Sequence, residues 1–481
     1  MSERKSISNA FRWMFIERIS VQGIQFILQI ALARLLNPEY YGELSIMIIF
    51  VNIAQVFVQN GFATALIQNK DVTEDDFSTV FWVSLGVVSG LYIVLFLFAP
   101  VIANFYNMPD IIVPFRVISA VLFPSALNSI QTAKISRELD FKKLFYSNIG
   151  GIIVAGISGI ILAISGAGIW ALVAQTLLNT SFSCLVMWFV VKWRPRWVVC
   201  KERLKVLISF GWKLLVSSLL ENLYQQLSSL VIGKKYDADM LAYYDRGRQF
   251  PQFLINALNS TVQGVLLPAM SAEQEHKEKV KSLMRQSISL SCYIVFPMMA
   301  GLAAVATPMV RVLLTDKWLP CVPFLQIFCF TQAFFVLNSA NLQAINAMGR
   351  SDIYLKLEVM KKIVGVTALV IALVFFDSPI AIALTGVVTT PIGLLINASP
   401  NKKLVNYSYL EQLKDIFPSF LLSMSMFGVV YAVQLLNFSS LFTLVLQIIT
   451  GILFYIGVSH FLKLEPYERV LQIIKKRITK N

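Results

Sequence analysis

Long apolar runs separated by short polar segments recur along almost the whole chain. A membrane-spanning helix needs about 20 predominantly apolar residues, and the sequence contains fourteen runs of about that length. They cover residues 10–36, 41–67, 78–104, 110–133, 144–165, 167–191, 206–233, 241–267, 285–307, 318–346, 355–376, 379–398, 415–436 and 440–462. The runs are too continuous for the roughly 10-residue alternating strands of a membrane barrel. The pattern predicts an all-α integral membrane protein with about fourteen transmembrane helices.

Four of these runs carry polar residues at steps of three and four, which places them on one helical face in each run. The faces comprise Arg18, Gln22, Gln25 and Gln29; Asn52, Gln55 and Gln59; Lys213, Ser217, Glu221, Tyr224 and Ser228; and Asp245, Gln249, Gln252, Asn256, Asn259 and Gln263. A buried polar group without a partner costs a few kcal/mol, so the faces should meet protein or water rather than lipid. Hydrogen bonds between helices are the structural alternative, at about 0.6 kcal/mol each. Four such faces favour a water-filled cavity.

An internal repeat relates the two halves of the chain. The segment around 11–42 aligns with 210–242, matching Phe11 to Phe210 and, after one inserted residue, Gly42 to Ala242. A second, shorter similarity pairs residues 127–137 with residues 337–350. Because an even number of helices separates the copies, we expect two six-helix lobes, 1–195 and 196–400, related by a pseudo-twofold axis along the membrane normal. Two further transmembrane helices in 401–463 and a basic tail at 464–481 lie outside this symmetry.

Composition and charge support a membrane protein and predict its orientation. The 481 residues are 57% hydrophobic and 14% charged, against about 25% charged in soluble domains. The net charge of +14 would suggest nucleic acid in a soluble chain, but here Lys and Arg collect in alternate loops. One set holds the basic segments 134–143, 192–205, 277–285, 350–362, 402–414 and 463–480, and the other holds only Arg34, Lys234, Lys235, Arg311 and Lys317. Basic loops stay cytoplasmic, so both termini are expected in the cytoplasm and no nucleic-acid partner is expected.

The basic tail has the pattern of an interfacial helix. Val470, Leu471, Ile474 and Ile478 fall on one helical face with basic residues opposite. This arrangement is typical of a helix lying on the inner leaflet. A frayed and solvated end is the alternative.

Ionisable residues inside the predicted spans suggest the chemistry of a ligand. The basic groups are Arg12, Arg18, Arg116, Lys213, Arg246 and Arg248, against the acidic groups Glu17, Glu221 and Asp245. A cationic, amide-rich cavity suits an anionic and hydroxylated solute, because guanidinium groups pair with phosphate and amides bind sugar hydroxyls. The candidate binding residues are Arg18, Gln22, Gln25, Asn52, Gln55, Arg246, Arg248, Gln252 and Asn256.

The acidic residues leave alternatives open. Glu17 with Arg18, and Asp245 with Arg246 or Arg248, are also interpretable as simple buried pairs. Glu221 has no basic neighbour on its own helix nearer than Lys213, which makes it the first candidate for an ion-coupling carboxylate. Asp245 is the second candidate.

Motifs for covalent chemistry and cofactors are missing. The five cysteines form no CxxC pair, and His276 and His460 stand far apart in sequence. No GxxxxGK[ST], HExxH or GxSxG run occurs. We therefore expect no disulfide framework, metal site, cofactor or enzymatic activity.

Several segments together resemble a known family. They are ARLLNPEYYG (33–42), GFATALIQNKDVTEDDFSTVFW (61–82), SRELDFKKL (136–144), YYDRGRQFPQ (243–252) and FPMMAGLAAVATPMVRVLLTDKW (296–318). In this order the segments resemble the polysaccharide transporters of the MOP flippase superfamily, most closely the Wzx-type branch for lipopolysaccharide and exopolysaccharide. The resemblance implies a fourteen-helix, two-lobed fold and directs attention to Tyr244 and Arg246. Gly247 stands where alanine is usual in that branch.

The resemblance also implies a function. Such a protein moves an undecaprenyl-pyrophosphate-linked oligosaccharide from the inner to the outer leaflet of the bacterial inner membrane by alternating access, for O-antigen, capsule or exopolysaccharide assembly. Membrane lipid, a polysaccharide polymerase and glycosyltransferases are the further partners it suggests. The alternative is a related exporter of drugs or small cations, for which an acidic or aromatic cavity would be expected. An enzyme that joins glycans would need larger outer loops than this chain has.

Overall fold

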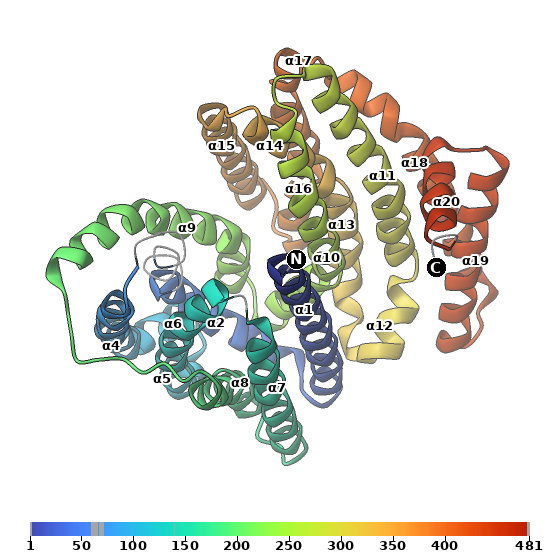
Figure 1. The fold of residues 1–481 in the computed structure, drawn as a ribbon. Helices are drawn as coiled ribbons and strands as arrows, with labels where there is room; N and C mark the ends of the chain where they lie inside the picture. Colours follow the sequence, from blue (N-terminus) through green and yellow to red (C-terminus); the bar gives the residue numbers. More distant parts are fainter. Residues whose placement is uncertain (1, 59–65, 67–71, 139, 479–481) are drawn as a thin grey trace. The chain divides into compact units, whose positions relative to one another are not determined.

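The computed structural model describes residues 2–58, 66, 72–138 and 140–478, and these are helical with short connections and no strand. The chain forms two compact units, Met1–Ala242 and Tyr243–Asn481. We refer to them as unit 1 and unit 2 (Figure 1). The expectation of an all-α protein is confirmed.

In its described residues, unit 1 contains nine helical elements and the start of α10. They are α1 (Ser2–Leu35), α2 (Pro38–Val58), α4 (Glu74–Phe105), η2 (Pro109–Ile111), α5 (Ile112–Ser119), α6 (Leu122–Glu138), α7 (Phe141–Ile164), α8 (Ile169–Val190), α9 (Lys201–Lys235) and the first residues of α10 (Ala238–Ala272). A capping box begins α4, because the Thr73 hydroxyl accepts from the Asp76 backbone N–H while the Asp76 carboxylate accepts from the Thr73 backbone N–H. Within the unit, α7 packs against both α8 and α1.

Unit 2 continues α10 and adds the rest of the chain. Its elements are α11 (Lys277–Ala304), α12 (Ala306–Leu314), η3 (Asp316–Cys321), α13 (Val322–Ala333), α14 (Phe335–Ala347), α15 (Ser351–Phe375), α16 (Pro379–Ala398), α17 (Asn401–Leu404), α18 (Tyr409–Ala432), η4 (Val433–Leu436), α19 (Ser440–Phe461) and α20 (Glu465–Ile478). In this unit α11 packs against α13, α14 and α18. The basic tail forms the helix α20, and its position on the inner leaflet stays a prediction.

In the described residues, helices lie on each of the fourteen predicted spans, although part of the span 41–67 falls outside the description. Among the described residues, ten segments are long and apolar enough to cross a membrane. The predicted spans 10–36, 206–233, 241–267 and 355–376 fall on the long helices α1, α9, α10 and α15, which are not among these ten. The positions of the helices are therefore as expected, and the count of fourteen membrane crossings stays a prediction.

The repeat is visible in the local structure of each half. Helix α1 ends at Leu35 and α2 begins at Pro38, while α9 ends at Lys235 and α10 begins at Ala238, so the same turn recurs 200 residues later. The segment from η2 to α6 is divided by a break after Ser119, and the segment from η3 to α14 by a break at Phe334. The proposed lobe boundary at residues 195/196 and the symmetry axis remain predictions.

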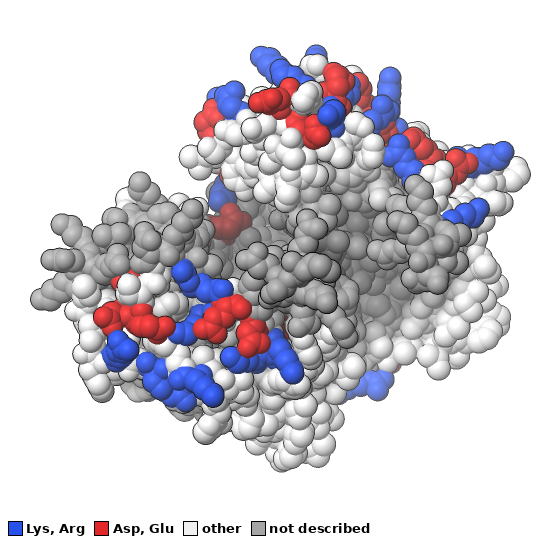
Figure 2. Space-filling model, viewed as in Figure 1, with Lys and Arg blue, Asp and Glu red and all other residues white. Residues whose placement is uncertain are grey.

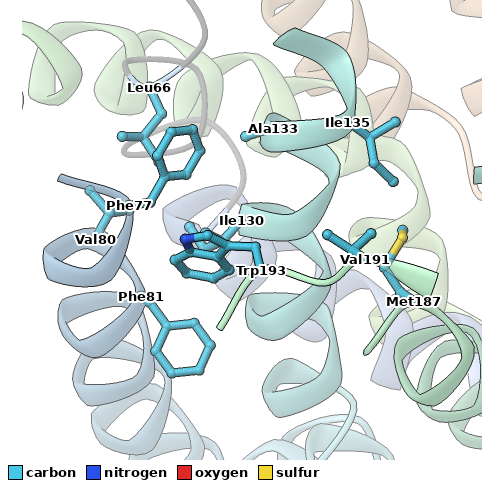
Figure 3. Close-up of a cluster of buried hydrophobic side chains, with 10 residues drawn as sticks. All are labelled: Leu66, Phe77, Val80, Phe81, Ile130, Ala133, Ile135, Met187, Val191 and Trp193. Atoms are coloured by element: carbon cyan, nitrogen blue, oxygen red, sulfur yellow. The ribbon is translucent and has the colours of Figure 1, made fainter. Parts of the chain in front are cut away.

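Aromatic and aliphatic side chains fill the core of unit 1 near the start of α4. Phe77 and Phe81 face Trp193, with ring centroids 6.0 and 6.2 Å apart. The buried cluster comprises Leu66, Phe77, Val80, Phe81, Ile130, Ala133, Ile135, Met187, Val191 and Trp193 (Figure 3). The segment that follows α8 therefore packs across α4 and α6 before α9 begins.

The last two long helices are fixed to α11 and α14 by polar contacts. The Gln412 and Asn341 amides donate to each other over 3.0 and 2.8 Å in a buried pair. Near the start of α18, Lys281 and Arg285 form ion pairs with Glu411 and Asp415 at 3.1 and 2.6 Å. Charged side chains gather at this α17 end of unit 2 (Figure 2). Helix α18, outside the repeat, thus packs on the rest of unit 2 through specific hydrogen bonds and ion pairs.

Replacing Gln412 with leucine is expected to destabilise this docking. The change removes two buried hydrogen bonds and leaves the Asn341 amide N–H without its partner on α18, at a cost of about 1–3 kcal/mol. The melting temperature of the purified protein in detergent should fall measurably. Ser425→Ala, on an exposed position of the same helix, is the matched control and should melt like the unaltered chain.

Candidate functional site

Helix α1 presents two different faces in unit 1. Trp13 packs against Phe145 of α7 with ring centroids 5.5 Å apart, and Leu28 fills the space beside Gly156, where a Cβ would lie 2.6 Å from its side chain. These contacts turn one face of α1 toward α7. The polar residues Arg18, Gln22 and Gln25 are exposed.

Glu17 lies on the buried face of α1 and has an uncharged partner. The Asn148 Nδ2 donates to Glu17 Oε1 over 2.8 Å, and the Ser183 hydroxyl donates to Asn148 Oδ1 over 3.1 Å. Glu17 is only 8% exposed. No ion pair links it to a described residue, so the interpretation of Glu17 with Arg18 as a buried pair is wrong. Asn148 and Ser183 are functional candidates that sequence spacing did not indicate, because they come from α7 and α8.

The polar residues of α2 are partly used inside unit 1. Asn52 and Gln55 are half-buried, and the Gln55 Nε2 donates to the Ser125 hydroxyl of α6 over 3.3 Å. Gln55 thus has the helix-linking role considered as the structural alternative. The side chains of Arg12, Lys213 and Gln263, and all of Gln59, lie outside the residues described.

Helix α10 carries an exposed polar face within unit 2. Asp245 and Arg248 form an ion pair at 3.3 Å and are both half-buried. Gln252 and Asn256 follow one and two turns later and are exposed. Asp245, Gln252 and Asn256 belong to the polar face expected from the sequence, and Arg248 lies beside them.

Tyr244 and Arg246 flank this face on either side and are buried. Tyr244 packs edge-on against Phe324 and Phe328, with centroids 5.8 and 5.2 Å apart. Arg246 lies 5.0 Å from the Trp318 ring centroid and donates to Gln249 Oε1 over 2.8 Å. Both are less than 10% exposed, at 5% and 7%. The structure therefore places them where they hold α10 against η3 and α13.

The candidate coupling residue Glu221 is half-buried on α9. Its Oε1 accepts from the Gln225 side chain over 2.9 Å, and it has a further contact. Asp245, the second candidate, is paired with Arg248. Among the described residues no group of three or more His, Cys, Asp or Glu side chains could hold a metal ion.

Solved structures show the class of fold. A structure of the lipid II flippase MurJ in an inward closed conformation matches 93% of this chain and 98% of its own, with a TM-score of 0.73 at 17% identity. An inward-facing multidrug resistance MATE family transporter of the MOP superfamily matches 83% of this chain and 99% of its own, with a TM-score of 0.62 at 14% identity. The fold is that of multi-span transporters of the MOP superfamily. A sequence model for the polysaccharide biosynthesis protein family matches residues 31–323, and the chain belongs to that family.

Three curated relatives match most of the chain at low identity. The teichuronic acid biosynthesis protein TuaB of Bacillus subtilis is 24% identical, with 73% of each chain covered. The succinoglycan biosynthesis transport protein ExoT of Rhizobium meliloti is 22% identical, with 73% of this chain and 71% of the relative covered. The lipopolysaccharide biosynthesis protein WzxC of Escherichia coli is 22% identical, with 77% and 76% covered. The family resemblance expected from the sequence is confirmed.

Proposed function

We propose that this protein carries an undecaprenyl-pyrophosphate-linked oligosaccharide from the cytoplasmic to the outer leaflet of a bacterial inner membrane by alternating access. Membership of the polysaccharide biosynthesis family supports this assignment, as do relatives named for succinoglycan transport and for teichuronic acid and lipopolysaccharide biosynthesis. The observation that carries it is the exposed polar faces of α1 and α10, which lie in the middle of predicted membrane spans.

The chemistry of the two faces fits this cargo. A pyrophosphate with its sugars cannot cross about 30 Å of hydrocarbon unaided, because removing its charges from water costs well over ~10 kcal/mol. Arg18 and Arg248 would pair with the pyrophosphate oxygens. Amides on the same faces would bind sugar hydroxyls, since an amide both donates and accepts hydrogen bonds; they are Gln22, Gln25, Gln252 and Asn256. On α2, Asn52 and the amide oxygen of Gln55 would form a second row. The polyprenyl tail would stay in the lipid.

The buried residues of the α10 motif have a different part in this proposal. Tyr244 and Arg246 would position the exposed face of α10 rather than touch the cargo, because both are enclosed by η3 and α13. A positioning residue stabilises the fold, whereas a residue that only touches the cargo does not. The distinction predicts that Arg246 variants lose stability along with transport.

Deletion of the gene in its host tests the proposal in the cell. We expect lipid-linked oligosaccharide to accumulate and the surface polysaccharide to disappear, with both restored by the gene on a plasmid. The proposal also places both termini in the cytoplasm and makes the polymerase and the glycosyltransferases functional partners. Normal polysaccharide together with new sensitivity to cationic dyes would instead identify a multidrug exporter.

We further propose Glu17 as the carboxylate that couples transport to a proton or sodium gradient. A buried carboxylate inside a membrane protein without a basic partner is costly and marks a functional site by default. Glu17 meets this description, since its described partner is the Asn148 amide, whereas Asp245 is neutralised by Arg248. Glu221 stays the second candidate.

Glu17→Gln is expected to uncouple transport from the gradient. The amide keeps the size and hydrogen-bonding capacity of the side chain but cannot take up a proton or balance a cation. In proteoliposomes, an imposed proton or sodium gradient should accelerate translocation by the unaltered protein and have no effect on Glu17→Gln. Glu221→Gln serves as the control. A gradient response lost in Glu221→Gln and kept in Glu17→Gln would reverse the assignment.

A further inference from the structure

The turns that the repeat places 200 residues apart touch each other in unit 1. The start of α10 lies so close to α2 that a Cβ on Gly42 would stand 1.8 Å from the carbonyl oxygen of Ala238. One turn further, a Cβ on Gly233 of α9 would lie 2.5 Å from the Ile46 side chain and 3.1 Å from that of Leu241. Gly42 thus lets the backbone of α2 pack directly on the backbone of α10, and Gly233 lets the backbone of α9 pack on the Ile46 and Leu241 side chains. We call it the α2–α10 contact.

Carboxylates from three segments surround the α2–α10 contact. Glu39 and Asp239 occupy the same place in the two repeats, in the first turn of α2 and of α10. The Asp239 carboxylate lies close to the Glu39 backbone N–H and within the field of the Glu39 carboxylate. Asp237 caps α10 by accepting from the Met240 backbone N–H over 2.8 Å. Like charges are therefore held together where the two helices begin.

Glu43 is the buried member of this group. Its side chain lies one turn beyond Glu39 and is only 9% exposed, and no hydrogen bond or ion pair to a described residue holds it. The charges that act on it are those of Glu39 and of Asp110 in η2, both negative. A buried carboxylate next to two others is stabilised by binding a proton.

Three basic side chains of unit 1 contact groups other than these carboxylates. Lys234 donates to the Phe105 carbonyl oxygen and lies 4.4 Å from that ring. Lys235 lies over the Tyr236 ring at 5.7 Å, and Arg116 of α5 donates to the Phe96 carbonyl oxygen over 3.2 Å. Arg34 is exposed at the end of α1, and the phenol of Tyr106 at the end of α4 is buried. No ion pair or hydrogen bond joins Glu43 to any of these groups.

We propose that the α2–α10 contact is a proton-sensitive latch, which closes when Glu43 and its neighbouring carboxylates share protons and opens when they are all ionised. Alternating access requires such a contact to form in one state and to part in another, so the purpose of the latch rests on the proposed function. The closing of the α2–α10 contact itself involves only residues of unit 1, so it can be tested without the cargo.

The direction of the effect follows from the linkage of protons to conformation. Burial, with the charges of Asp237 and Glu39, raises the pKa of Asp239, which precedes the predicted membrane span, although the Glu39 backbone N–H acts in the opposite sense. A raised carboxyl pKa in the closed state means that this state binds protons more tightly than the open state. Closure is then favoured at low pH and lost as the pH rises through the range in which these carboxylates titrate. One linked proton changes the ratio of closed to open by up to about tenfold per pH unit.

The accessibility of a buried cysteine tests the latch without any substrate. Ile46→Cys is placed in a Cys200→Ser background, and its labelling by a maleimide is timed in nanodiscs, where the reagent reaches both faces of the membrane. Because a maleimide reacts with the thiolate, each rate is divided by the rate for N-acetylcysteine at the same pH, and labelling below means this corrected rate. We expect labelling at least about tenfold faster at pH 8 than at pH 5.5. Leu241→Cys, on the other side of the contact, is a second reporter in case the first variant folds poorly.

Two added variants separate charge from packing. Glu43→Gln should keep labelling slow at both pH values, and Glu74→Gln, at the opposite end of α4, should leave the pH response intact. Gly42→Ala should make labelling fast at both pH values because its Cβ cannot fit against Ala238, whereas Gly90→Ala, with open space around it, should not. Labelling independent of pH in the parent, or a pH response unchanged by Glu43→Gln, would overturn the latch. The labelling experiment contains no glycan, so a negative result would overturn the latch without contradicting the proposed transport function.

Discussion

Transport should fall by at least about a hundredfold when Arg18 and Arg248 are both replaced by glutamine. Each guanidinium is expected to make charge-assisted hydrogen bonds to the pyrophosphate, which contribute about 1.5–3 kcal/mol apiece. Losing both therefore costs about 3–6 kcal/mol, and every 1.4 kcal/mol is a factor of ten. The rate of translocation of a labelled lipid-linked oligosaccharide in proteoliposomes measures the effect.

The controls for this double variant address charge and folding. Arg116→Gln removes an arginine that packs on Phe96 in a predicted span and should transport normally. Asp245→Asn belongs in the series because Arg248→Gln leaves Asp245 without its ion partner. The melting temperature of the double variant should match that of the parent, since both arginines are at least partly exposed. Normal transport by the double variant would remove the proposed role of these two faces.

Gly247→Val is expected to destabilise unit 2 by about 1–3 kcal/mol, the usual cost of overpacking. A Cβ at this position would lie 2.6 Å from the Phe324 Cβ and 2.8 Å from the Leu325 backbone nitrogen. The backbone cannot give way as a flexible side chain can, so α10 must move away from α13. The same movement would pull Tyr244 off Phe324 and Phe328.

Thermal unfolding and transport together identify this effect. The melting temperature should fall, and transport should fall with it, because the exposed face of α10 is positioned through the buried one. Gly90→Val is the matched control, as nothing lies within 4 Å of a Cβ there, and it should behave like the parent. A stable, active Gly247→Val protein would mean that the close packing of α10 on α13 has no part in positioning the site.

The periodicity of apolar residues was sufficient to locate the helices, because each span must satisfy its backbone hydrogen bonds internally and bury its side chains in lipid or protein. The same reasoning found the exposed residues Gln252 and Asn256 on α10 and Gln22 and Gln25 on α1. It could not find that Arg246 is buried. A guanidinium beside Trp318 and one in water look alike in a sequence, and only the packing of η3 on α10 distinguishes them.

Tertiary contacts explain the remaining differences. The partner of Glu17 is Asn148, 131 residues away in the chain, so the neighbouring Arg18 was the obvious but wrong choice. The carboxylates around the α2–α10 contact come from residues near 40, 110 and 240. Each segment alone reads as an ordinary helix start with acidic residues in its first turn, which the helix dipole favours. Their common location emerges only when the repeat-related turns meet.

Direct measurement of translocation tests the central claim. The purified protein is reconstituted into liposomes with a fluorescent undecaprenyl-pyrophosphate-linked oligosaccharide, and the fraction of label reached by a membrane-impermeant quencher is followed over time. We predict that the protein moves the labelled lipid between leaflets many times faster than protein-free liposomes do, and that the Arg18→Gln, Arg248→Gln variant does not. A rate equal to that of protein-free liposomes, from protein shown to be folded and given its native glycan and an ion gradient, would contradict the account.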